Sequence, residues 1–392
     1  MLRLSRRAGS LSESVTLAID AKAKALAAEG KRVLGFGVGQ PDFDTPEPIK
    51  EAARRSLDGR IGGYTPVAGT PALREAIAAA FRKSGIEGAA AGNVLASCGA
   101  KHSLYNAVQV LVDDGDEVIV PAPYWVSYPS MVDAAGGRTV VVDTGPDACI
   151  LTPERLAAAM TDKTKLLIFN SPGNPSGVTH TREQIRALAP VLAARPDVAV
   201  LSDEIYQHLV YGDTEFSSFA AACPELADRI VTVNGVSKSY AMTGWRIGYA
   251  TGPKDVIGAM TRFQSHTTSN PTAIAQAAAV AALTGPQDAV EEMRLAFDRR
   301  RLLMSQLLVE IPGFELVPPT GAFYCFPDIS GALNEKTGDT PFEFTNRLLD
   351  EHLVACVPGE AFGAPTSIRL SYACIDDAIR EGCARLAKFV GA

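Results

Sequence analysis

The chain has 392 residues, of which 47% are hydrophobic and 21% are charged. These ordinary globular proportions exclude a mainly disordered or fibrous protein, and the length predicts two or three domains, or one large and one small domain. Lysine and arginine total 37 against 44 acidic residues, so the net charge is −7 and binding to nucleic acid through phosphate contacts is not expected. No apolar run approaches the roughly 18–20 residues of a membrane helix, so no membrane association is expected.

Cysteine and histidine are too dispersed to predict a disulfide framework or a metal site. No two cysteines form a Cys-x-x-Cys pair, and their number is odd, which is typical of reduced thiols in a cytoplasmic protein. Residues 1–15 carry three arginines without a following apolar core, so they are expected to form a flexible arm and not a secretory signal.

Helices and short apolar strands alternate along most of the chain. A first helix is expected over residues 16–28, and later helices over 72–83, 103–112, 154–160 and 182–192. Thr70-Pro71, Thr152-Pro153 and Thr181 provide start signals, because a threonine hydroxyl can accept one of the free N–H groups of the first turn. Strands are expected over 117–120, 138–142, 165–170, 198–202, 230–234 and 246–251. This alternation predicts an α/β fold with a mostly parallel, mixed sheet between helices.

The pattern changes near Gly285-Pro286, which interrupts the chain. A long helix is expected over residues 288–310, short strands over 322–326 and 367–372, and a last helix from residue 376. We therefore predict a large domain over 47–287 and a smaller α+β domain formed by both chain ends, 16–46 and 288–392, with the arm over 1–15.

Lys238 stands in the segment from Asn234 to Arg246, which connects two predicted strands. A single lysine is usually a solvated surface charge, but small and apolar residues flank this one, and it follows a strand closely. Such surroundings make the amine more easily neutral and nucleophilic, as a Schiff base with an aldehyde requires. Ser237 and Arg246 could bind a phosphate, arginine through its planar fork of donors.

Asp203 lies at the end of a predicted buried strand, where a carboxylate is costly unless it is paired. It can cap a helix or form a salt bridge, or it can pair with a protonated pyridine nitrogen, with Tyr206 one short turn further on. Asn174 lies in a turn rich in proline and glycine after another strand, and it can form a hydrogen bond with a phenolic oxygen.

Small residues from Ser97 to Ala100 precede a predicted helix, whose free N–H groups suit a phosphate, although an ordinary loop-to-helix junction has the same pattern. Trp125, one of two tryptophans, can stack on a flat ring. Arg369 lies inside an apolar strand and needs an anionic partner, which is either a substrate carboxylate or a structural ion pair.

Together these segments resemble the class I aminotransferases, fold-type I enzymes that depend on pyridoxal 5′-phosphate (PLP). The resemblance covers nearly the whole chain and is carried by Asn174-Pro175, residues 202–206, residues 237–246 and residues 369–372. A finer resemblance, to the bacterial subgroup of aspartate aminotransferases, is carried by residues 38–46, 64–66, 99–101 and 124–129.

The resemblance implies a homodimer with shared active sites and a ping-pong aldimine mechanism that transfers an amino group between aspartate and 2-oxoglutarate. Amino acids and 2-oxo acids are then the substrates. The alternatives are an aromatic or prephenate-type aminotransferase of the same subgroup, a PLP-dependent β-lyase, and a non-enzymatic regulator with this fold. A regulator usually needs an additional DNA-binding module, and residues 1–15 are too short to hold one.

The matching residues take the following roles by resemblance. Lys238 is similar to the lysine that holds the cofactor as an internal aldimine and moves the proton. Asp203 is similar to the partner of the pyridine nitrogen. Tyr206 and Asn174 match the donors to the phenolic oxygen of the ring, and Trp125 matches the residue that stacks on it.

The phosphate and the partner subunit involve a second group of matches. Gly99, Ala100, Ser237 and Arg246 resemble the residues that surround the cofactor phosphate. Tyr64 resembles the residue that reaches the phosphate of the neighbouring subunit's cofactor.

The substrate site is implied by a third group. Arg369 and the backbone of Gly39 resemble the groups that bind the substrate α-carboxylate, beside Trp125 and Asn174. Lys101, together with residues 14–16, resembles the group that binds the distal carboxylate in the bacterial subgroup.

Two departures from the family pattern stand out. Gly235 occupies a position, three residues before the lysine, where the family often has a hydroxyl that contacts the phosphate. Residues 264–270 lack the arginine with which many aspartate aminotransferases bind the distal carboxylate from the partner subunit. The expectation of an acidic substrate therefore rests mainly on Lys101.

Overall fold

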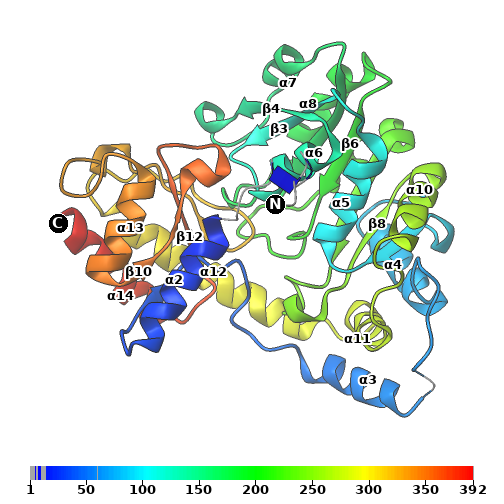
Figure 1. The fold of residues 1–392 in the computed structure, drawn as a ribbon, viewed down its shortest axis with the longest axis horizontal. Helices are drawn as coiled ribbons and strands as arrows, with labels where there is room; N and C mark the ends of the chain where they lie inside the picture. The colour runs from blue at the N-terminus through cyan, green and yellow to red at the C-terminus, as the bar shows by residue number, and fades with distance from the viewer. Residues whose placement is uncertain (1–4, 6–7, 10–14, 60, 392) are drawn as a thin grey trace.

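The computed structural model describes residues 5, 8–9, 15–59 and 61–391. This part of the chain contains a central sheet of seven strands in the order β2-β8-β7-β6-β5-β3-β4 (Figure 1). Neighbouring strands are parallel, except that β8 runs antiparallel to both β2 and β7. The predicted α/β fold with a mostly parallel, mixed sheet is confirmed. The strands are β2 (Val94–Ser97), β3 (Glu117–Ala122), β4 (Arg138–Asp143), β5 (Thr164–Asn170), β6 (Ala199–Asp203), β7 (Ile230–Gly235) and β8 (Gly248–Thr251).

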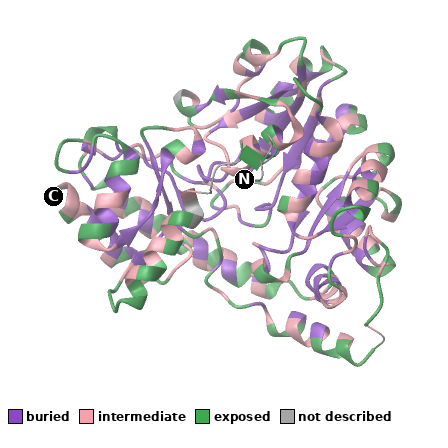
Figure 2. Cartoon of the chain, in the orientation of Figure 1, coloured by how far each residue is buried: buried purple, intermediate pink, exposed green. Residues whose placement is uncertain are grey.

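Alternate residues of the central strands pack on opposite faces of this sheet. Val118 and Val120 of β3 belong to one hydrophobic cluster, whereas Ile119 between them belongs to another. The first cluster includes residues of α5 (Ala100–Leu111), α6 (Ser127–Ala135) and α10 (Lys254–Ser265), and the second includes residues of α7 (Pro153–Ala159), α8 (Arg182–Ala193) and α9 (Phe219–Ala222). Figure 2 shows the strands buried between partly exposed helices. Burial on both faces explains why the strands are continuous apolar runs.

The threonines that were predicted to begin three helices do so. The hydroxyls of Thr70, Thr152 and Thr181 each accept a hydrogen bond from the backbone N–H three residues later, at the starts of α4 (Pro71–Lys83), α7 and α8. Helices α3 (Glu47–Leu57), α4 and α11 (Ala273–Thr284) form a third hydrophobic cluster with residues of β2 and β8.

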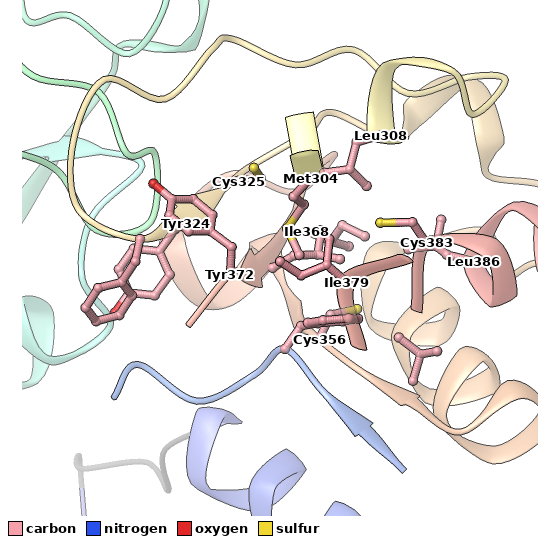
Figure 3. Packing of buried hydrophobic residues seen from close by; sticks show 14 of the residues in the cluster. Met304, Leu308, Tyr324, Cys325, Cys356, Ile368, Tyr372, Ile379, Cys383 and Leu386 are labelled. Atoms are coloured by element: carbon pink, nitrogen blue, oxygen red, sulfur yellow. The ribbon is translucent and has the colours of Figure 1, made fainter. Parts of the chain in front are cut away.

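A second core lies beside the sheet and combines segments from both chain ends. Strand β1 (Leu34–Gly35) pairs with β10 (Val354–Ala355), and β12 (Ile368–Ser371) pairs with β9 (Tyr324–Cys325) and β11 (Val357–Pro358). Figure 3 shows part of the buried cluster that joins these strands to the helices. The helices of this cluster are α12 (Asp288–Val309), α13 (Pro341–His352) and α14 (Asp376–Val390). Helix α2 (Val15–Ala28) packs through Ile19 on a smaller cluster that includes Val357 of β11.

The proposed domain boundaries stay predictions. The second core includes residues from 16–46 and 288–392, as that division requires, but also Ile205, Tyr206, Leu209 and Tyr211 from the middle of the chain. The predicted arm, residues 1–15, lies almost wholly outside the described residues.

Two predicted elements near the expected phosphate site differ at their starts. The strand expected from residue 246 begins at Gly248, because residues 243–245 form a turn of 3-10 helix and Arg246 adopts a left-handed conformation with φ 56°. The helix expected from residue 103 begins at Ala100, directly after Gly99. The earlier start of the helix places its first residues at Gly99 and Ala100, which were predicted to bind phosphate.

Candidate active site

A pocket of about 340 Å³ opens at the carboxyl ends of the parallel strands, between the sheet and the second core. Loops that follow the strands of an open parallel sheet usually bind ligands at this edge. Most of the residues predicted from the sequence line this pocket. They are Gly39, Ala100, Lys101, Trp125, Asn174, Asp203, Tyr206, Ser237, Lys238, Arg246 and Arg369.

Asp203 is the last residue of β6, and its carboxylate is buried at the floor of the pocket. The Tyr128 hydroxyl donates to Oδ2 at 2.7 Å, and the Ile205 N–H donates to Oδ1 at 3.3 Å. Burial raises the pKa of Asp203 to about 6, although both hydrogen bonds and the charge of Lys238 oppose the rise. A buried carboxylate of this kind is suited to a cationic N–H donor in the pocket.

Glu204 anchors the chain where it leaves β6. Its Oε1 accepts hydrogen bonds from the Ser202 hydroxyl, the Ser218 hydroxyl and the Phe219 N–H, at 2.8–2.9 Å. Burial raises the pKa of this carboxyl to about 7. The network ties the end of β6 to the start of α9, and so fixes the turn from which Tyr206 enters the pocket.

Tyr206 is buried between the sheet and the second core. Its hydroxyl forms a 2.9 Å hydrogen bond with the Tyr324 hydroxyl, and burial raises the pKa of both phenols. Each phenol therefore stays protonated at neutral pH, and the pair retains a hydroxyl hydrogen to donate into the pocket.

Lys238 follows β7 by three residues and points into the pocket. Its Nζ donates to the Gly39 carbonyl at 2.6 Å. Burial, followed by the charges of Arg369 and Arg246, lowers the pKa of Lys238 to about 8. The amine is thus far more readily neutral at physiological pH than an ordinary lysine, as the sequence predicted from its apolar neighbours.

Arg369 is a buried arginine of β12 at the other side of the pocket. Its Nη1 donates to Asn174 Oδ1 at 2.9 Å, and its Nη2 donates to the Gly37 carbonyl at 2.7 Å. The guanidinium lies over the rings of Tyr324 and Phe362, 4.6 and 4.9 Å from their centroids. Its Nε is buried without a partner among the described residues, so the charge has no carboxylate and is available to an anion.

The start of α5 and the Arg246 guanidinium lie side by side, an arrangement suited to a phosphate. Gly99 caps α5 with φ +91°, and a Cβ atom there would lie 2.4 Å from Arg246 Nη2. Only glycine permits this approach, which brings a cation to free N–H groups at a helix start. Ser237 lines the same pocket.

Lys101 and Trp125 lie together near the pocket mouth. The Lys101 ammonium stands 4.8 Å from the centroid of the Trp125 ring, and that ring packs edge-on against Tyr128. Partial burial, and then the nearby Arg246 charge, lower the pKa of Lys101. Of residues 14–16, which were predicted to act with Lys101, Ser14 lies outside the described residues, the side chain of Thr16 is not described, and Val15 does not line the pocket.

Neither Tyr64 nor Gly235 lines this pocket. Of the surface of Tyr64, 94% is exposed. Gly235 lies at the end of β7, where a Cβ atom would stand 3.0 Å from the Ile247 carbonyl oxygen. A serine or threonine at this position would be crowded, so the strand pairing itself favours glycine.

The sequence interpretation assigned no role to Tyr128 or Tyr324. Tyr128 was visible only as part of a motif, and its hydrogen bond to Asp203 spans 75 positions in the sequence. Tyr324 meets Tyr206 across 118 positions, and no local pattern indicates such a contact. A tyrosine within a short apolar strand was the only signal for Tyr324.

Several kinds of site are not found among the described residues. No group of three or more histidine, cysteine, aspartate or glutamate side chains there is arranged to hold a metal ion. No helix in the described ranges combines the length and apolar character needed to span a membrane. All seven cysteines are described, and each is a free thiol.

The residues present fit PLP in charge and shape. A buried amine, a buried carboxylate and the start of α5 at Ala100, with Arg246 nearby, share one pocket, which Trp125 and the phenol of Tyr206 also line. A flat cationic ring that bears an aldehyde, a phenolic oxygen and a phosphate meets a suitable partner at each of these positions.

Comparisons with known proteins agree with this geometry. The family model described as aminotransferase class I and II matches residues 31–386. An aspartate aminotransferase of Geobacillus stearothermophilus is 49% identical over 393 residues and covers 100% of both chains. An aspartate/prephenate aminotransferase of Cereibacter sphaeroides is 48% identical, with 99% of each chain covered.

A solved structure extends the agreement to the fold. Aspartate aminotransferase of Thermus thermophilus with maleate superposes with a TM-score of 0.93 at 42% identity, covering 99% of this chain and 100% of that one. Since the family model spans most of the sequence and these relatives match it end to end, the chain belongs to the class I and II aminotransferases, enzymes that use PLP.

Proposed function

We propose that this protein transfers an amino group between aspartate and 2-oxoglutarate. The observation that carries the proposal is the combination of the Lys238 amine with two further cations, Arg369 and Lys101, in one pocket. Two cations suit the two carboxylates of a dicarboxylic substrate. The relative from Geobacillus stearothermophilus, named an aspartate aminotransferase, supports the assignment.

The cofactor would be held by residues of both the sheet and its loops. Gly99, Ala100, Ser237 and Arg246 would bind the phosphate. When bound, PLP supplies an electron sink for the bonds of the substrate α-carbon. This role needs a protonated ring nitrogen, and Asp203 would keep a proton there because a buried carboxylate favours a neighbouring cation.

The remaining ring contacts follow from the same pocket. Trp125 would stack on the face of the ring. Tyr206 and Asn174 would donate to its phenolic oxygen: Tyr206 through its hydroxyl, and Asn174 through its amide nitrogen, since its amide oxygen already accepts from Arg369.

Lys238 would move the proton of the reaction. Its Nζ, with a pKa lowered to about 8, can take a proton from the substrate α-carbon and return it without a large mismatch in acidity. Arg369 would bind the α-carboxylate through its guanidinium, which has no carboxylate partner among the described residues, and the Gly39 backbone would bound the same site. This fixes which substituent of the α-carbon faces Lys238.

Replacement of Lys101 by serine is expected to reduce activity toward dicarboxylic substrates selectively. A charged hydrogen bond in a partly buried site is worth roughly 1.5–3 kcal/mol, or about 10–100-fold in kcat/KM. Lys101→Ser should therefore lower kcat/KM for aspartate and glutamate much more than for an aromatic or aliphatic amino acid, in steady-state assays with each donor. Lys101→Arg, which keeps the charge, is the matched control.

Arg369→Ala provides the contrasting case. Loss of the α-carboxylate partner should weaken all amino acid substrates alike. If Lys101→Ser instead reduces every substrate equally, Lys101 does not bind the side chain and the aspartate assignment loses its main support.

We also propose that the enzyme is a homodimer with shared active sites. Tyr64 supports this, because a large aromatic side chain that is 94% exposed in the single chain is suited to a contact outside it. Sedimentation at micromolar concentration should give about twice the 41.3 kDa chain mass. A fully active monomer would refute the prediction.

Absorbance spectroscopy of the PLP-loaded enzyme tests the reaction itself. Aspartate should shift the cofactor band, and 2-oxoglutarate should restore it, since each half-reaction is reversible. The relative from Cereibacter sphaeroides, named an aspartate/prephenate aminotransferase, makes prephenate the second candidate acceptor. A cycle with prephenate faster than with 2-oxoglutarate would favour that alternative.

The location of the enzyme is proposed from its thiols. Seven free cysteines, four of them buried, fit a reducing compartment, where no disulfides are needed for stability. We therefore propose a cytoplasmic enzyme.

A further inference from the structure

The segment over residues 61–70, which carries Tyr64, has no helix or strand of its own. Its shape is consequently not set by a regular ladder of backbone hydrogen bonds. One backbone bond, from the Ala96 N–H to the Ala68 carbonyl at 3.0 Å, ties it to the edge strand β2. The position of Tyr64 must therefore depend largely on side chains that form hydrogen bonds with this segment.

Gln276 of α11 contacts the segment at two points, Thr65 and Thr70. Its Oε1 accepts from the Thr70 N–H at 2.8 Å, and its Nε2 donates to the Thr65 hydroxyl at 2.9 Å. The other Nε2 hydrogen goes to the Pro271 carbonyl at 2.8 Å, in the turn before α11. The Gln276 amide therefore links Thr65, which follows Tyr64, to Thr70 at the end of the segment and to the turn before α11.

The Gln276 amide is buried, and its hydrogen bonds require both a donor and an acceptor at this position. Gln276 is only 1% exposed, and both hydrogens of its amide nitrogen are used. Gly69 lies beside it with φ +102°, a conformation that favours glycine, and a Cβ atom there would stand 3.1 Å from the Ala96 Cβ. A glutamate could not donate to the Pro271 carbonyl, and an aliphatic side chain would leave buried polar groups unpaired.

Gln264 of α10 gives a second point of support from the same side. It is fully buried, and its Nε2 donates to the Val67 carbonyl at 3.0 Å and to the Ala96 carbonyl at 2.9 Å. It contacts the middle of the segment, whereas Gln276 contacts the residue next to Tyr64. The distinction makes Gln276 the more direct determinant of where Tyr64 points.

We propose that Gln276 is a positioning residue for the partner subunit's cofactor: it fixes residues 65–70 so that Tyr64 projects toward the phosphate site of the other chain. This inference rests on the proposed homodimer and on the proposed role of Tyr64. Gln276 itself does not line the pocket of its own chain.

The affinity for PLP, measured by titration of cofactor-free enzyme, tests the inference without any turnover. Tyr64→Phe removes the hydroxyl and should raise the Kd about 10-fold, the effect of one hydrogen bond to a charged group. Gln276→Leu should raise the Kd by a similar factor. The double variant should bind PLP no more weakly than either single variant, because both changes remove the same contact.

Two further variants keep the test interpretable. Thr65→Val removes the hydroxyl that accepts from Gln276 on a half-buried residue, and it should raise the Kd in the same direction if Gln276→Leu does not fold. Thr337→Val is the matched control: it loses a buried hydroxyl that donates to the Ala332 carbonyl, far along the chain from residues 61–70, and should leave the Kd unchanged.

The outcomes distinguish an error in the proposed shared site from an error in the role of Gln276. If Tyr64→Phe leaves the Kd unchanged, or sedimentation shows a monomer, the shared site is wrong and the inference is overturned with it. If Tyr64→Phe weakens PLP binding but the effects of Gln276→Leu or Thr65→Val are absent or simply additive to it, only the role of Gln276 is wrong.

Discussion

Replacement of Lys238 by alanine should lower the rate of transamination by about 10⁴-fold, the upper range for loss of a positioned proton-transfer group. The covalent attachment of the cofactor is lost as well, which adds to the effect. PLP should still bind, because the groups around Gly99, Asp203 and Trp125 do not depend on the amine. Single-turnover absorbance measurements with aspartate would give the rate directly.

The attachment site can be located independently of rate. Borohydride reduction of the wild-type enzyme with PLP, followed by peptide mapping, should place the label on Lys238. Lys101, the other lysine of the pocket, is the internal control because it also carries a primary amine. A label on Lys101 would contradict the assignment of Lys238.

Replacement of Asp203 by asparagine should lower kcat/KM by about 10²–10³-fold, comparable to the loss of one electrostatic partner at a reacting centre. Asparagine has nearly the same shape, but its single oxygen can accept from only one of Tyr128 and Ile205, and it has no charge with which to hold a proton on the ring nitrogen. Asp203→Glu keeps the charge and should retain more activity. Equal losses in both variants would indicate a requirement for shape instead of charge.

A second measurement on Asp203→Asn needs no cofactor. The folded-state pKa of Asp203, about 6, is raised above its ordinary value near 3.8, so the native state binds the extra proton and wild-type stability falls as pH rises from about 4 through 6. The shift corresponds to up to about 3 kcal/mol. Asn does not titrate, so the Asp203→Asn variant should not lose stability in this way. Its free energy of unfolding relative to the wild type, measured with urea, should therefore increase as the pH rises from about 4 to 6. A constant difference between pH 4 and 7 would contradict the raised pKa.

Much of the fold was accessible from the sequence because local signals and burial agreed. Thr70-Pro71 and Thr152-Pro153 start helices by a mechanism that depends only on neighbouring residues. Helix α11 was not predicted, because alanine dominates it and its apolar residues show no helical periodicity to distinguish one face. Strand β2 was also missed, since four residues carry too little pattern to recognise.

The site residues divide in the same way. Lys238, Asp203 and Arg369 were accessible because a charge within an apolar stretch stands out in any sequence. Gln276 carried no comparable signal: it is an uncharged residue in an alanine-rich helix, and two of its three partners, Thr65 and Thr70, lie 211 and 206 positions away. The hydrogen bonds that place functional groups are long-range, so only the three-dimensional structure reveals them.

A bound ligand and the backbone carbonyls of residues 36–39 would compete for the same hydrogen-bond donors. Gly37 and Gly39 direct their carbonyls at Arg369 and Lys238, the two cations proposed to act on the substrate. A lysine engaged in chemistry has fewer hydrogens to donate, and an arginine that turns toward a carboxylate must redistribute its own. A ligand that binds to Arg369 or Lys238 therefore weakens or breaks hydrogen bonds that hold residues 36–39 in place. Order in the backbone at the pocket edge and occupancy of the pocket are thus thermodynamically linked, and part of the intrinsic affinity is offset by the bonds that are given up.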